Sequence, residues 1–573
     1  MNAAKIARIA DLMSYSVQTV DADSKIIDLI QRLRRIGHEG YPVLENGHVV
    51  GLLTLRDADK ALEYGLEAAT VRDVMLGGTV TLHPDDPVSL LASTMIENDW
   101  GQIPVVDRHH RLLGIVTRTD LIQYWGQLHA AKATQISQIE IDSAKHILGK
   151  EPVHLIEQIA QHAQKHDILL YMVGGVVRDL LLERRNTDID FVVEGNAIEF
   201  AENICATYGG RLHTYKPFGT AKWIIDDKVA KTINLPLDSI PDHIDFASTR
   251  SELYEHPTAL PTVYNSSIKL DLRRRDFTMN TLAAQLSPKR AMWRILDFYG
   301  GLADIEQGLI RVLHSLSFVD DPTRIIRAVR FSERLQFVIE PRTAELIQTA
   351  LPMLRRITGE RIRHELELLL KEASPSRGLL KLEALGALKH IHPDLTVKPT
   401  IRTAFDTLEN GFPQWSENTI LIKWHLLMAQ IDAEKVVAVA TRLLVSRNQA
   451  EGFQKTAYIA QESTQLQHPL AKPSEIDALL SPLSEEGLIA LWILLDDETA
   501  RQRIEQYHDE WQYIKPTITG HDLRERGLQP GHEYRIILER LREGWLDGDI
   551  GHADEEQLAL KRLIAEVYYD STR

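Results

Sequence analysis

The sequence predicts a multidomain α/β plus all-α protein. Its 573 residues are too many for one hydrophobic core, so several domains are expected. A segment of about 62 residues occurs twice near the N-terminus, and short apolar runs with strand character follow it. From about Leu302 onward, the apolar spacing is almost wholly helical. We therefore expect a repeated N-terminal module, a small α/β head, and a helical neck, body and tail.

Composition narrows the class of protein. Hydrophobic residues make up 44% and charged residues 25%, as in ordinary globular proteins. The net charge of −16 argues against a general nucleic-acid binder, so any RNA contact needs a local basic surface. The single cysteine, Cys205, excludes an intramolecular disulfide framework. No signal peptide and no run of roughly 18 apolar residues is visible, so we expect a cytoplasmic protein with no membrane partner.

The repeated segment predicts two β-hairpins. GYPVLENGHVVGLLTLRDADKA (residues 40–61) recurs as GQIPVVDRHHRLLGIVTRTDLIQ (residues 101–123). In each copy the second strand ends in Thr, and Asp follows three residues later. An amphipathic helix precedes the first hairpin at residues 24–37. The pattern resembles a tandem pair of CBS domains, a module that often binds adenosine nucleotides.

The resemblance implies a nucleotide site in this module. In CBS domains the Thr hydroxyl and the Asp carboxylate hold ribose hydroxyls, and a carboxylate can accept both hydrogens of a cis-diol. The corresponding residues are Thr54, Asp57, Thr117 and Asp120. Two alternatives stay open, because each Thr and Asp can simply cap the following helix and such modules often serve only for dimerisation. We expect a homo-oligomer formed through this module.

A second motif lies at residues 171–193, YMVGGVVRDLLLERRNTDIDFVV. The apolar run at residues 168–173 predicts a buried strand. Gly174 and Gly175 then turn the chain and let a phosphate approach the backbone. The following helical pattern would direct free N–H groups at an anion, and Arg178 in its first turn could reach a triphosphate.

The motif ends in two aspartates on a predicted strand at residues 187–193. Asp188 and Asp190 are two residues apart, so their side chains share a face and suit Mg²⁺. The order of strand, Gly-Gly, helix and Asp-x-Asp resembles motif A of the nucleotidyltransferases, as in class II CCA-adding enzymes and bacterial poly(A) polymerases. The resemblance implies that Asp188 and Asp190 are catalytic and hold two Mg²⁺ ions. Asp245 could supply a third carboxylate.

Two further motifs support this resemblance. DLRRRDFTMNTLA (residues 271–283) resembles the family's Arg-Arg-Asp motif, which contacts the sugar and phosphates of the incoming nucleotide. Its counterparts here are Arg274, Arg275 and Asp276; the alternative is a charged strand end before an amphipathic helix. SFVDDPTRIIRAVRFSERLQF (residues 317–337) resembles the Glu-Asp-x-x-Arg motif, but Asp320 replaces Glu and has a shorter reach.

Asp321 and Arg324 match the rest of that motif. Residues three apart share one face of a helix, and both cytosine and adenine present an amine beside a ring-nitrogen acceptor. A carboxylate and a guanidinium could therefore accept CTP and ATP without a template. The alternative is that Asp321 caps the helix and Pro322 takes its first position, and both roles can hold together.

An arginine stripe and a polar loop complete the pattern. Arg324, Arg327, Arg330 and Arg334 fall on one side of the predicted helix, and we favour contact with RNA or triphosphate over a solvated face. Residues 250–263, RSELYEHPTALPTV, resemble the flexible segment that family members use to switch to ATP, which favours A addition. Residues 519–550 resemble the family's tail, which holds the tRNA elbow.

We therefore expect a template-independent tRNA nucleotidyltransferase that adds A or CCA to the tRNA 3′ end from ATP and CTP and releases pyrophosphate. The alternatives are a poly(A) polymerase and a nucleotide-sensing regulator with an inactive transferase. The expected domains are a CBS pair (1–128), a helical linker (129–150), the catalytic head (151–300), the neck with the recognition helix (301–375), and the tRNA-binding body and tail (376–573).

Overall fold

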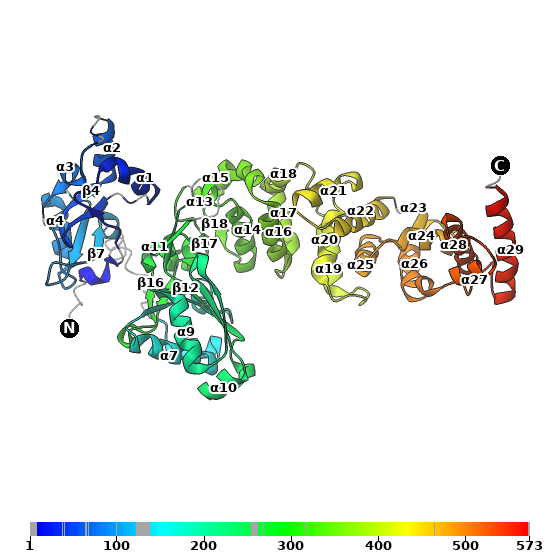
Figure 1. Ribbon diagram of the computed structural model, residues 1–573, viewed down its shortest axis with the longest axis horizontal. Helices are drawn as coiled ribbons and strands as arrows, with labels where there is room; N and C mark the ends of the chain where they lie inside the picture. The colour runs from blue at the N-terminus through cyan, green and yellow to red at the C-terminus, as the bar shows by residue number, and fades with distance from the viewer. Residues whose placement is uncertain are drawn as a thin grey trace. The chain divides into compact units, whose positions relative to one another are not determined.

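The structure is a computed structural model that divides into two compact units. It describes residues 8–570 except 16, 37, 39, 64–65, 67, 79, 99, 122–137, 254–261, 266, 316 and 463. The first unit comprises Met1–Asp321 and Phe337–Leu346, and the second comprises Pro322–Gln336 and Ile347–Arg573. Figure 1 shows strands in the blue to green part of the chain and helices in the part that follows.

The N-terminal module, residues 8–121, confirms the predicted repeat. Its two sheets have the strand orders β2-β3-β4-β5 and β1-β7-β6, and each contains one of the predicted hairpins. The strands are β1 (Ser14–Tyr15), β2 (Val20–Asp21), β3 (Gly40–Glu45), β4 (His48–Thr54), β5 (Leu76–Gly77), β6 (Gln102–Val106) and β7 (Leu112–Thr117). The helices are α1 (Ile26–Ile36), α2 (Leu55–Glu63), α3 (Val71–Val74) and α4 (Val88–Asn98).

Matching glycines allow a further strand to pair with each hairpin, β5 with the first and β1 with the second. A Cβ on Gly51 would lie 2.6 Å from the carbonyl oxygen of Leu76 in β5. The equivalent Gly114 has Ser14 of β1 in the same place, at 2.5 Å. Any side chain would separate these strands, so the repeat is preserved in backbone contacts as well as in sequence.

The head is built on one seven-stranded sheet of order β10-β11-β12-β9-β8-β15-β16. Only β9 and β12 pair in parallel; the other neighbours are antiparallel. The strands are β8 (Leu169–Val173), β9 (Asp190–Glu194), β10 (Arg211–Tyr215), β11 (Thr220–Ile224), β12 (His243–Ser248), β15 (Ala283–Gln285) and β16 (Arg294–Leu296). The helices are α6 (Ile141–Leu148), α7 (Lys150–Lys165), α8 (Gly175–Leu181), α9 (Ala197–Tyr208), α10 (Asp227–Ile233), α11 (Ile268–Arg273), α12 (Gly301–Gln307) and α13 (Ser317–Asp320).

The core of the head begins earlier in the chain than the predicted domain boundary at residue 151. Phe191, Trp223 and Phe246 are fully buried at its centre. Ile139 and Leu148 belong to the same cluster, and the Ile139 amide donates to the carbonyl of Trp293 at 2.9 Å. The end of the predicted linker is therefore part of the head.

The predicted flexible segment at residues 250–263 is bounded by paired strands. β13 (Arg250–Leu253) and β14 (Thr262–Asn265) form an antiparallel two-stranded sheet. Residues 254–261 lie outside the described residues, so the expectation of flexibility stays a prediction. A second short sheet pairs β17 (Leu309–Ile310) in parallel with β18 (Val338–Ile339).

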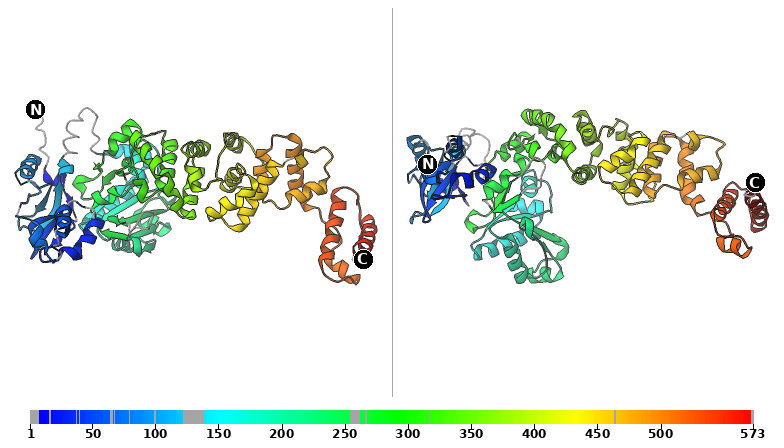
Figure 2. Two further views of the ribbon diagram at one scale, coloured as in Figure 1. Left: turned by 90° about the horizontal axis from the view of Figure 1, so that it is seen from above. Right: turned by 45° about the horizontal axis from the view of Figure 1, so that its top comes forward.

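The second unit is all helical in its described part, as the sequence predicts. Figure 1 labels helices of this unit from α14 to α29, and Figure 2 shows the same helices from two other directions. α28 and α29 lie side by side. In the described chain, no helix is both long and apolar enough to cross a membrane. The helices, with α15 spanning the division between the units, are α14 (Thr323–Leu335), α15 (Pro341–Ala350), α16 (Gly359–Leu370), α17 (Pro375–Ala384), α18 (Ala387–Ile391), α19 (Ile401–Asn410), α20 (Thr419–Met428), α21 (Ala433–Arg442), α22 (Arg447–Gln461), α23 (Thr464–Gln467), α24 (Pro473–Leu480), α25 (Glu485–Leu494), α26 (Glu498–Asp509), α27 (Gly520–Glu525), α28 (His532–Leu546) and α29 (Ala553–Asp570).

Candidate active site

The predicted Gly-Gly turn joins β8 to α8. Gly174 has φ 75°, in the left-handed region that favours glycine, and α8 begins at Gly175. A Cβ on Gly174 would lie 2.7 Å from Nη1 of Arg275. Glycine is therefore required here for two reasons: the backbone turn needs its positive φ, and Arg275 of the Arg-Arg-Asp motif lies where a side chain would be.

Arg178 lies in a buried hydrogen-bond network rather than at an open surface. Only 2% of it is exposed, and its guanidinium donates to Asp179 at 2.8 Å and to Asn280 at 2.7 Å. Asn186 donates to the other oxygen of Asp179 at 2.8 Å, and its own oxygen accepts from the Asp188 amide at 2.9 Å. Arg178 thus supports the segment that carries Asp188, and its direct contact with a triphosphate stays a prediction.

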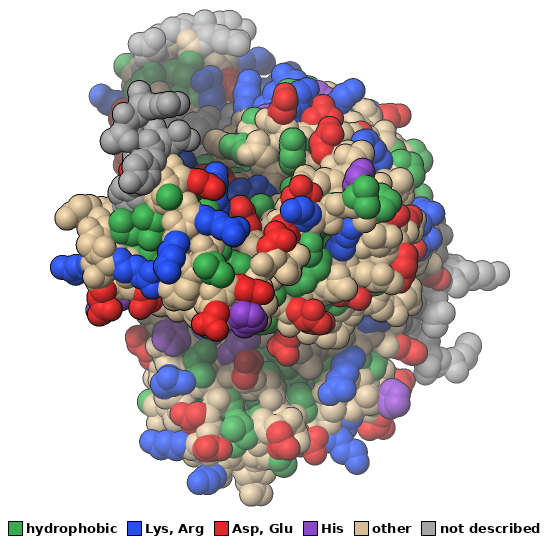
Figure 3. All heavy atoms as spheres, turned by 90° about the vertical axis from the view of Figure 1, so that its right-hand side faces the viewer, with side chains coloured by type: hydrophobic (Ala, Val, Ile, Leu, Met, Phe, Trp, Pro, Cys, Tyr) green, Lys and Arg blue, Asp and Glu red, His purple; other side chains and the backbone are tan. Residues whose placement is uncertain are grey.

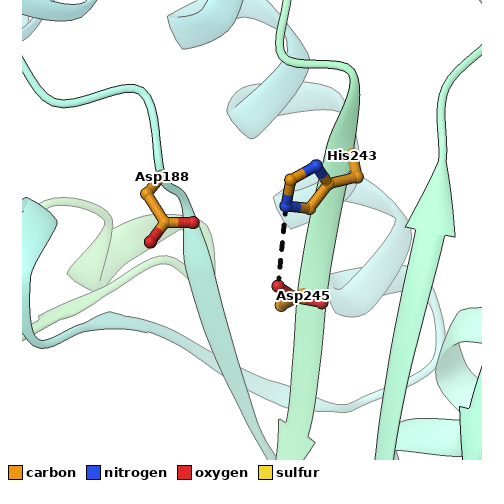
Figure 4. Close-up of side chains that lie close together, drawn as sticks. All are labelled: Asp188, His243 and Asp245. Atoms are coloured by element: carbon orange, nitrogen blue, oxygen red, sulfur yellow. Dashed lines mark ion pairs between the residues drawn. The ribbon is translucent and has the colours of Figure 1, made fainter. Parts of the chain in front are cut away.

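The acidic residues gather at the start of the parallel strand pair. β9 begins at Asp190 rather than at the predicted residue 187, so Asp188 is exposed in the segment before the strand. Asp245 of β12 is the register partner of Asp190. One ligand atom each from Asp188, His243 and Asp245 lies within 4.8 Å of the others (Figure 4). Asp188 and Asp245 are therefore neighbours in space, whereas Asp190 is not part of this group and lies beside Asp245 in the strand register.

The negative charge around Asp190 is only partly offset by nearby basic side chains. Burial and the charge of Asp188 raise the pKa of Asp190 to about 6, and Asp245 adds to the rise. Arg275 and Lys222 act in the opposite direction. A buried carboxylate whose pKa is raised by neighbouring carboxylates belongs to a donor set suited to a divalent cation, which would relieve the repulsion. The residues therefore fit a metal site.

Two basic side chains contact Asp245. The Lys222 ammonium donates to its Oδ2 at 2.8 Å, and His243 Nε2 lies 3.7 Å from the same oxygen. Lys222 and His243 are not among the site residues predicted from the sequence. The signal for His243 was present, since residues two apart on a strand share a face and His243 is two residues before Asp245. Lys222 comes from the antiparallel neighbour β11, and only the strand pairing reveals it.

The Arg-Arg-Asp motif lies at and beyond the end of α11. Asp271 is fully buried and accepts hydrogen bonds from Arg274 at 2.9 Å and from Arg275 at 3.4 Å. Asp276 is also buried, and its carboxylate accepts from the side chain of Asn280 at 2.9 Å. Because Asn280 also binds Arg178, one buried network joins the motif to α8. The resemblance had not indicated Asn280 or Asn186.

The nucleotide-recognition motif divides between the two units. Asp320 and Asp321 end the first segment of the first unit, and Asp320 lies 3.8 Å from His314. Arg324 lies in the second unit and is 6% exposed. The prediction that Asp321 caps the helix and Pro322 begins it is wrong. In the structure α14 begins at Thr323, and Pro322 occupies the N-cap position. Recognition of one base by Asp321 and Arg324 stays a prediction.

The expected arginine stripe is not one exposed face. Arg330 is 6% exposed and pairs with Glu365 at 3.6 Å and Glu372 at 3.3 Å. Arg327 also contacts Glu365, at 3.3 Å, and both guanidinium groups lie over the Phe331 ring. Contact of Arg324 and Arg327 with RNA or triphosphate stays a prediction. The buried ion pairs of Arg330 give this residue a structural role in the helical unit.

The Thr and Asp residues of the N-terminal module lie as the repeat predicts. Thr54 donates to Asp57, and Thr117 donates to Asp120 at 2.8 Å. In each copy the Asp amide donates back to the Thr hydroxyl, at 3.1 Å and 3.2 Å. These reciprocal bonds fit the capping alternative, and binding of ribose stays a prediction.

Clustered carboxylates beside a glycine turn and an Arg-Arg-Asp segment define the nucleotidyltransferase class. The comparisons agree with this class: residues 170–311 match the poly A polymerase head domain family. Residues 336–398 match the family described as "Probable RNA and SrmB- binding site of polymerase A", and residues 9–64 and 71–126 match the CBS domain.

Named relatives narrow the class. An A-adding tRNA nucleotidyltransferase from Geobacter sulfurreducens is 32% identical, over 97% of this chain and 64% of its own length. One from Halalkalibacterium halodurans is 32% identical, over 70% of this chain and 89% of its own. The structure of the Thermotoga maritima CCA-adding enzyme complexed with tRNA is 30% identical with a TM-score of 0.56, covering 75% of this chain and 98% of that one. The chain therefore belongs to the tRNA nucleotidyltransferase family.

Proposed function

We propose that this protein adds A to the 3′ end of tRNA, using ATP as the donor. The proposal is carried by the carboxylates of Asp188 and Asp245, which lie together with His243, and by Asp190, the register partner of Asp245. The two similar relatives named above are A-adding enzymes, which favours A over CCA. Because the chain spans 64% of the length of the Geobacter relative, its whole activity is a proposal and does not follow from that relative's name.

In this proposal the 3′-hydroxyl oxygen of the tRNA attacks the α-phosphorus of ATP. A new phosphodiester bond forms, the bond to the β-phosphate breaks, and pyrophosphate leaves. Asp188 and Asp190 would hold Mg²⁺, which makes the attacking hydroxyl more acidic and neutralises charge on the phosphates. Arg275, beside Gly174 and close enough to Asp190 to lower its pKa, would bind phosphate oxygens.

Some parts of the proposal rest on the resemblance alone. Base selection by Asp321 and Arg324, contact of the tail with tRNA, binding of an adenosine nucleotide by the CBS pair, and assembly into an oligomer are of this kind. Cytoplasmic location belongs with them. All of them can be separated from the transfer reaction by experiment, because none uses the carboxylate cluster.

Primer extension on three tRNA transcripts tests the proposal. The transcripts end at the discriminator base, at the first C and at CC, and each receives labelled ATP or CTP with Mg²⁺ beside a non-tRNA oligonucleotide. We expect only the CC-ended transcript to gain one A. A complete CCA on the shortest transcript would mean that one pocket takes both bases, and long A tails on any RNA would indicate a poly(A) polymerase.

The variant Asp190→Ala tests the site itself. Loss of a metal-holding carboxylate should lower incorporation by at least about a hundredfold. Asp238→Ala is the matched control, because Asp238 is an exposed aspartate of the same domain outside the cluster. Survival of activity in Asp190→Ala would rule out the proposed site, and inactivity of the wild-type chain with all substrates would rule out the proposed function.

A further inference from the structure

The two copies of the CBS repeat differ in what their aspartates contact. Oδ2 of Asp120 accepts from the amide and the hydroxyl of Thr117, both at 2.8 Å. Its Oδ1 forms an ion pair with the ammonium of Lys269, which lies in α11 of the head. Asp57, the counterpart in the first copy, has only its Thr54 bonds among the described residues. The aspartate of the second copy, Asp120, is therefore bound to a residue of the head.

The ion pair is buried, unlike its neighbour at the same contact. The side chains of Lys269 and Asp120 are 14% and 4% exposed. Among the described residues, Arg294 and Asp11 form another pair between the module and the head; they are 48% and 41% exposed and lie 3.6 Å apart. A buried pair is costly to break, because each partner would leave an uncompensated charge behind, whereas an exposed pair contributes little.

Other contacts of Lys269 support its role as a fixed anchor. Burial, with a smaller effect from Arg273, lowers the pKa of Lys269, whereas a carboxylate in contact favours the charged ammonium. The carbonyl of Lys269 accepts from the Tyr299 hydroxyl at 2.8 Å, and its ammonium lies 5.8 Å from the Phe298 ring centroid. These contacts fix both ends of the residue within the head.

α11 links this anchor to the reacting groups. Lys269 is two residues before Asp271, the buried carboxylate that holds Arg274 and Arg275. Arg275 in turn lies against Gly174 and lowers the pKa of Asp190. The contacts thus run from the second CBS copy through one six-residue helix to Arg275, and the charge of Arg275 acts on Asp190.

We propose that Asp120 is a positioning residue of the transferase, which holds α11 through Lys269 and so places Arg275 at the active site. The proposal rests on the proposed function, since Arg275 acts on the nucleotide. It gives the CBS module a part in the reaction that does not depend on a bound ligand. It also makes any event at Asp120, such as a ligand that competes with Lys269 for the carboxylate, a way to lower activity.

A double-mutant cycle in the full-length chain tests this coupling. Asp120→Asn and Lys269→Met should each lower kcat/KM for ATP by about tenfold or more, because a misplaced binding group is costly, and should leave KM for tRNA unchanged. The double variant should be no worse than either single variant, since the same contact is already lost. Asp11→Asn, at the exposed pair of the same contact, is the matched control and should change activity less than about twofold.

Two further measurements separate positioning from general damage. Lys269→Arg keeps a cation and should recover part of the lost kcat/KM. Amide hydrogen exchange across residues 268–276 should become faster in Asp120→Asn and not in Asp11→Asn. Wild-type activity in all four single variants with unchanged exchange would overturn the inference. An inactive wild-type chain would overturn the proposed function instead, and the exchange measurement would still test the contact.

Discussion

Gly174 combines two constraints at one residue of the active site. Its φ of 75° strains any other residue, and a Cβ there would lie 2.7 Å from Arg275. We expect Gly174→Ala to lower the free energy of unfolding by about 1–3 kcal/mol and to reduce transfer at least about tenfold, because the arginine must move. Gly300 is the control, since it has φ 78° and a Cβ added there would meet no atom within 4 Å.

Gly300→Ala isolates the backbone strain from the loss of the arginine position. Because the backbone strain is similar, it should lower the free energy of unfolding by an amount similar to that of Gly174→Ala. It should leave kcat/KM for ATP near the wild-type value. Steady-state kinetics and urea unfolding of both variants make the comparison. Equal losses of activity in the two variants would mean that the approach of Arg275 to Gly174 has no catalytic importance.

A second residue gives the helical unit its own pH dependence. Burial lowers the pKa of His425 to about 4, against a smaller opposing effect of Glu486, and its Nδ1 lies 2.9 Å from the Thr456 hydroxyl. Because the unfolded chain binds this proton near pH 6.5 and the folded chain does not, stability falls as the pH is lowered through this interval. The loss should reach about 2 kcal/mol at about pH 5.

Urea unfolding followed by circular dichroism at several pH values measures this loss. The variant His425→Gln keeps a hydrogen-bonding side chain but cannot titrate, so its stability should fall less between about pH 7 and pH 5. The difference in slope, rather than the stability at one pH, is the quantity of interest. Parallel slopes in wild type and variant would contradict the assignment to His425.

At the scale of elements, α14 is held by α16 through buried charge. Arg330 pairs with Glu365 and Glu372, both of α16 or just beyond its end. Replacing one partner of a buried pair leaves the other uncompensated, so Arg330→Met should destabilise the second unit by about 3–5 kcal/mol. Arg356→Met, at an exposed position of the same unit, should change stability by less than about 0.5 kcal/mol.

Thermal unfolding of the two variants tests the role of this contact. If Arg330→Met kept the wild-type stability but lost RNA or nucleotide binding, the arginine would serve the substrate rather than the packing of α14 on α16. That outcome would favour the contact with RNA or triphosphate that the arginine spacing predicts.

The elements show where sequence patterns suffice. The strand before Gly174 and the helix after it follow from local apolar spacing, and both are present. The helix that carries the arginines is also present, but Arg327 and Arg330 pair with glutamates more than thirty residues away, which no local pattern can supply. In the same way, the proximity of Asp271, Arg275 and Gly174 depends on tertiary contacts.

At the scale of the whole molecule, the repeat and the helical second half were predictable because each has a regular spacing of apolar residues. The division at Asp321 was not, because a continuous helical pattern carries no sign of which helix packs with which unit. Nor could the sequence distinguish the two copies of the repeat, since Thr and Asp occur in both. In the structure, the contact of Asp120 with Lys269 distinguishes the two aspartates.

The distribution of charge over the whole molecule makes a last prediction about RNA. The net charge is −16, and Figure 3 shows acidic and basic side chains intermixed over the face it presents. A chain of this kind can make few phosphate contacts, so tRNA affinity should fall by less than about a thousandfold between roughly 50 and 200 mM salt. Recognition must then depend on the shape and the 3′ end of the tRNA, and a non-tRNA RNA of equal length should compete at least about tenfold more weakly. Filter binding at several salt concentrations, with both competitors, measures these quantities. A steeper salt dependence with equal competition by both RNAs would indicate general electrostatic binding and would favour a poly(A) polymerase over a tRNA enzyme.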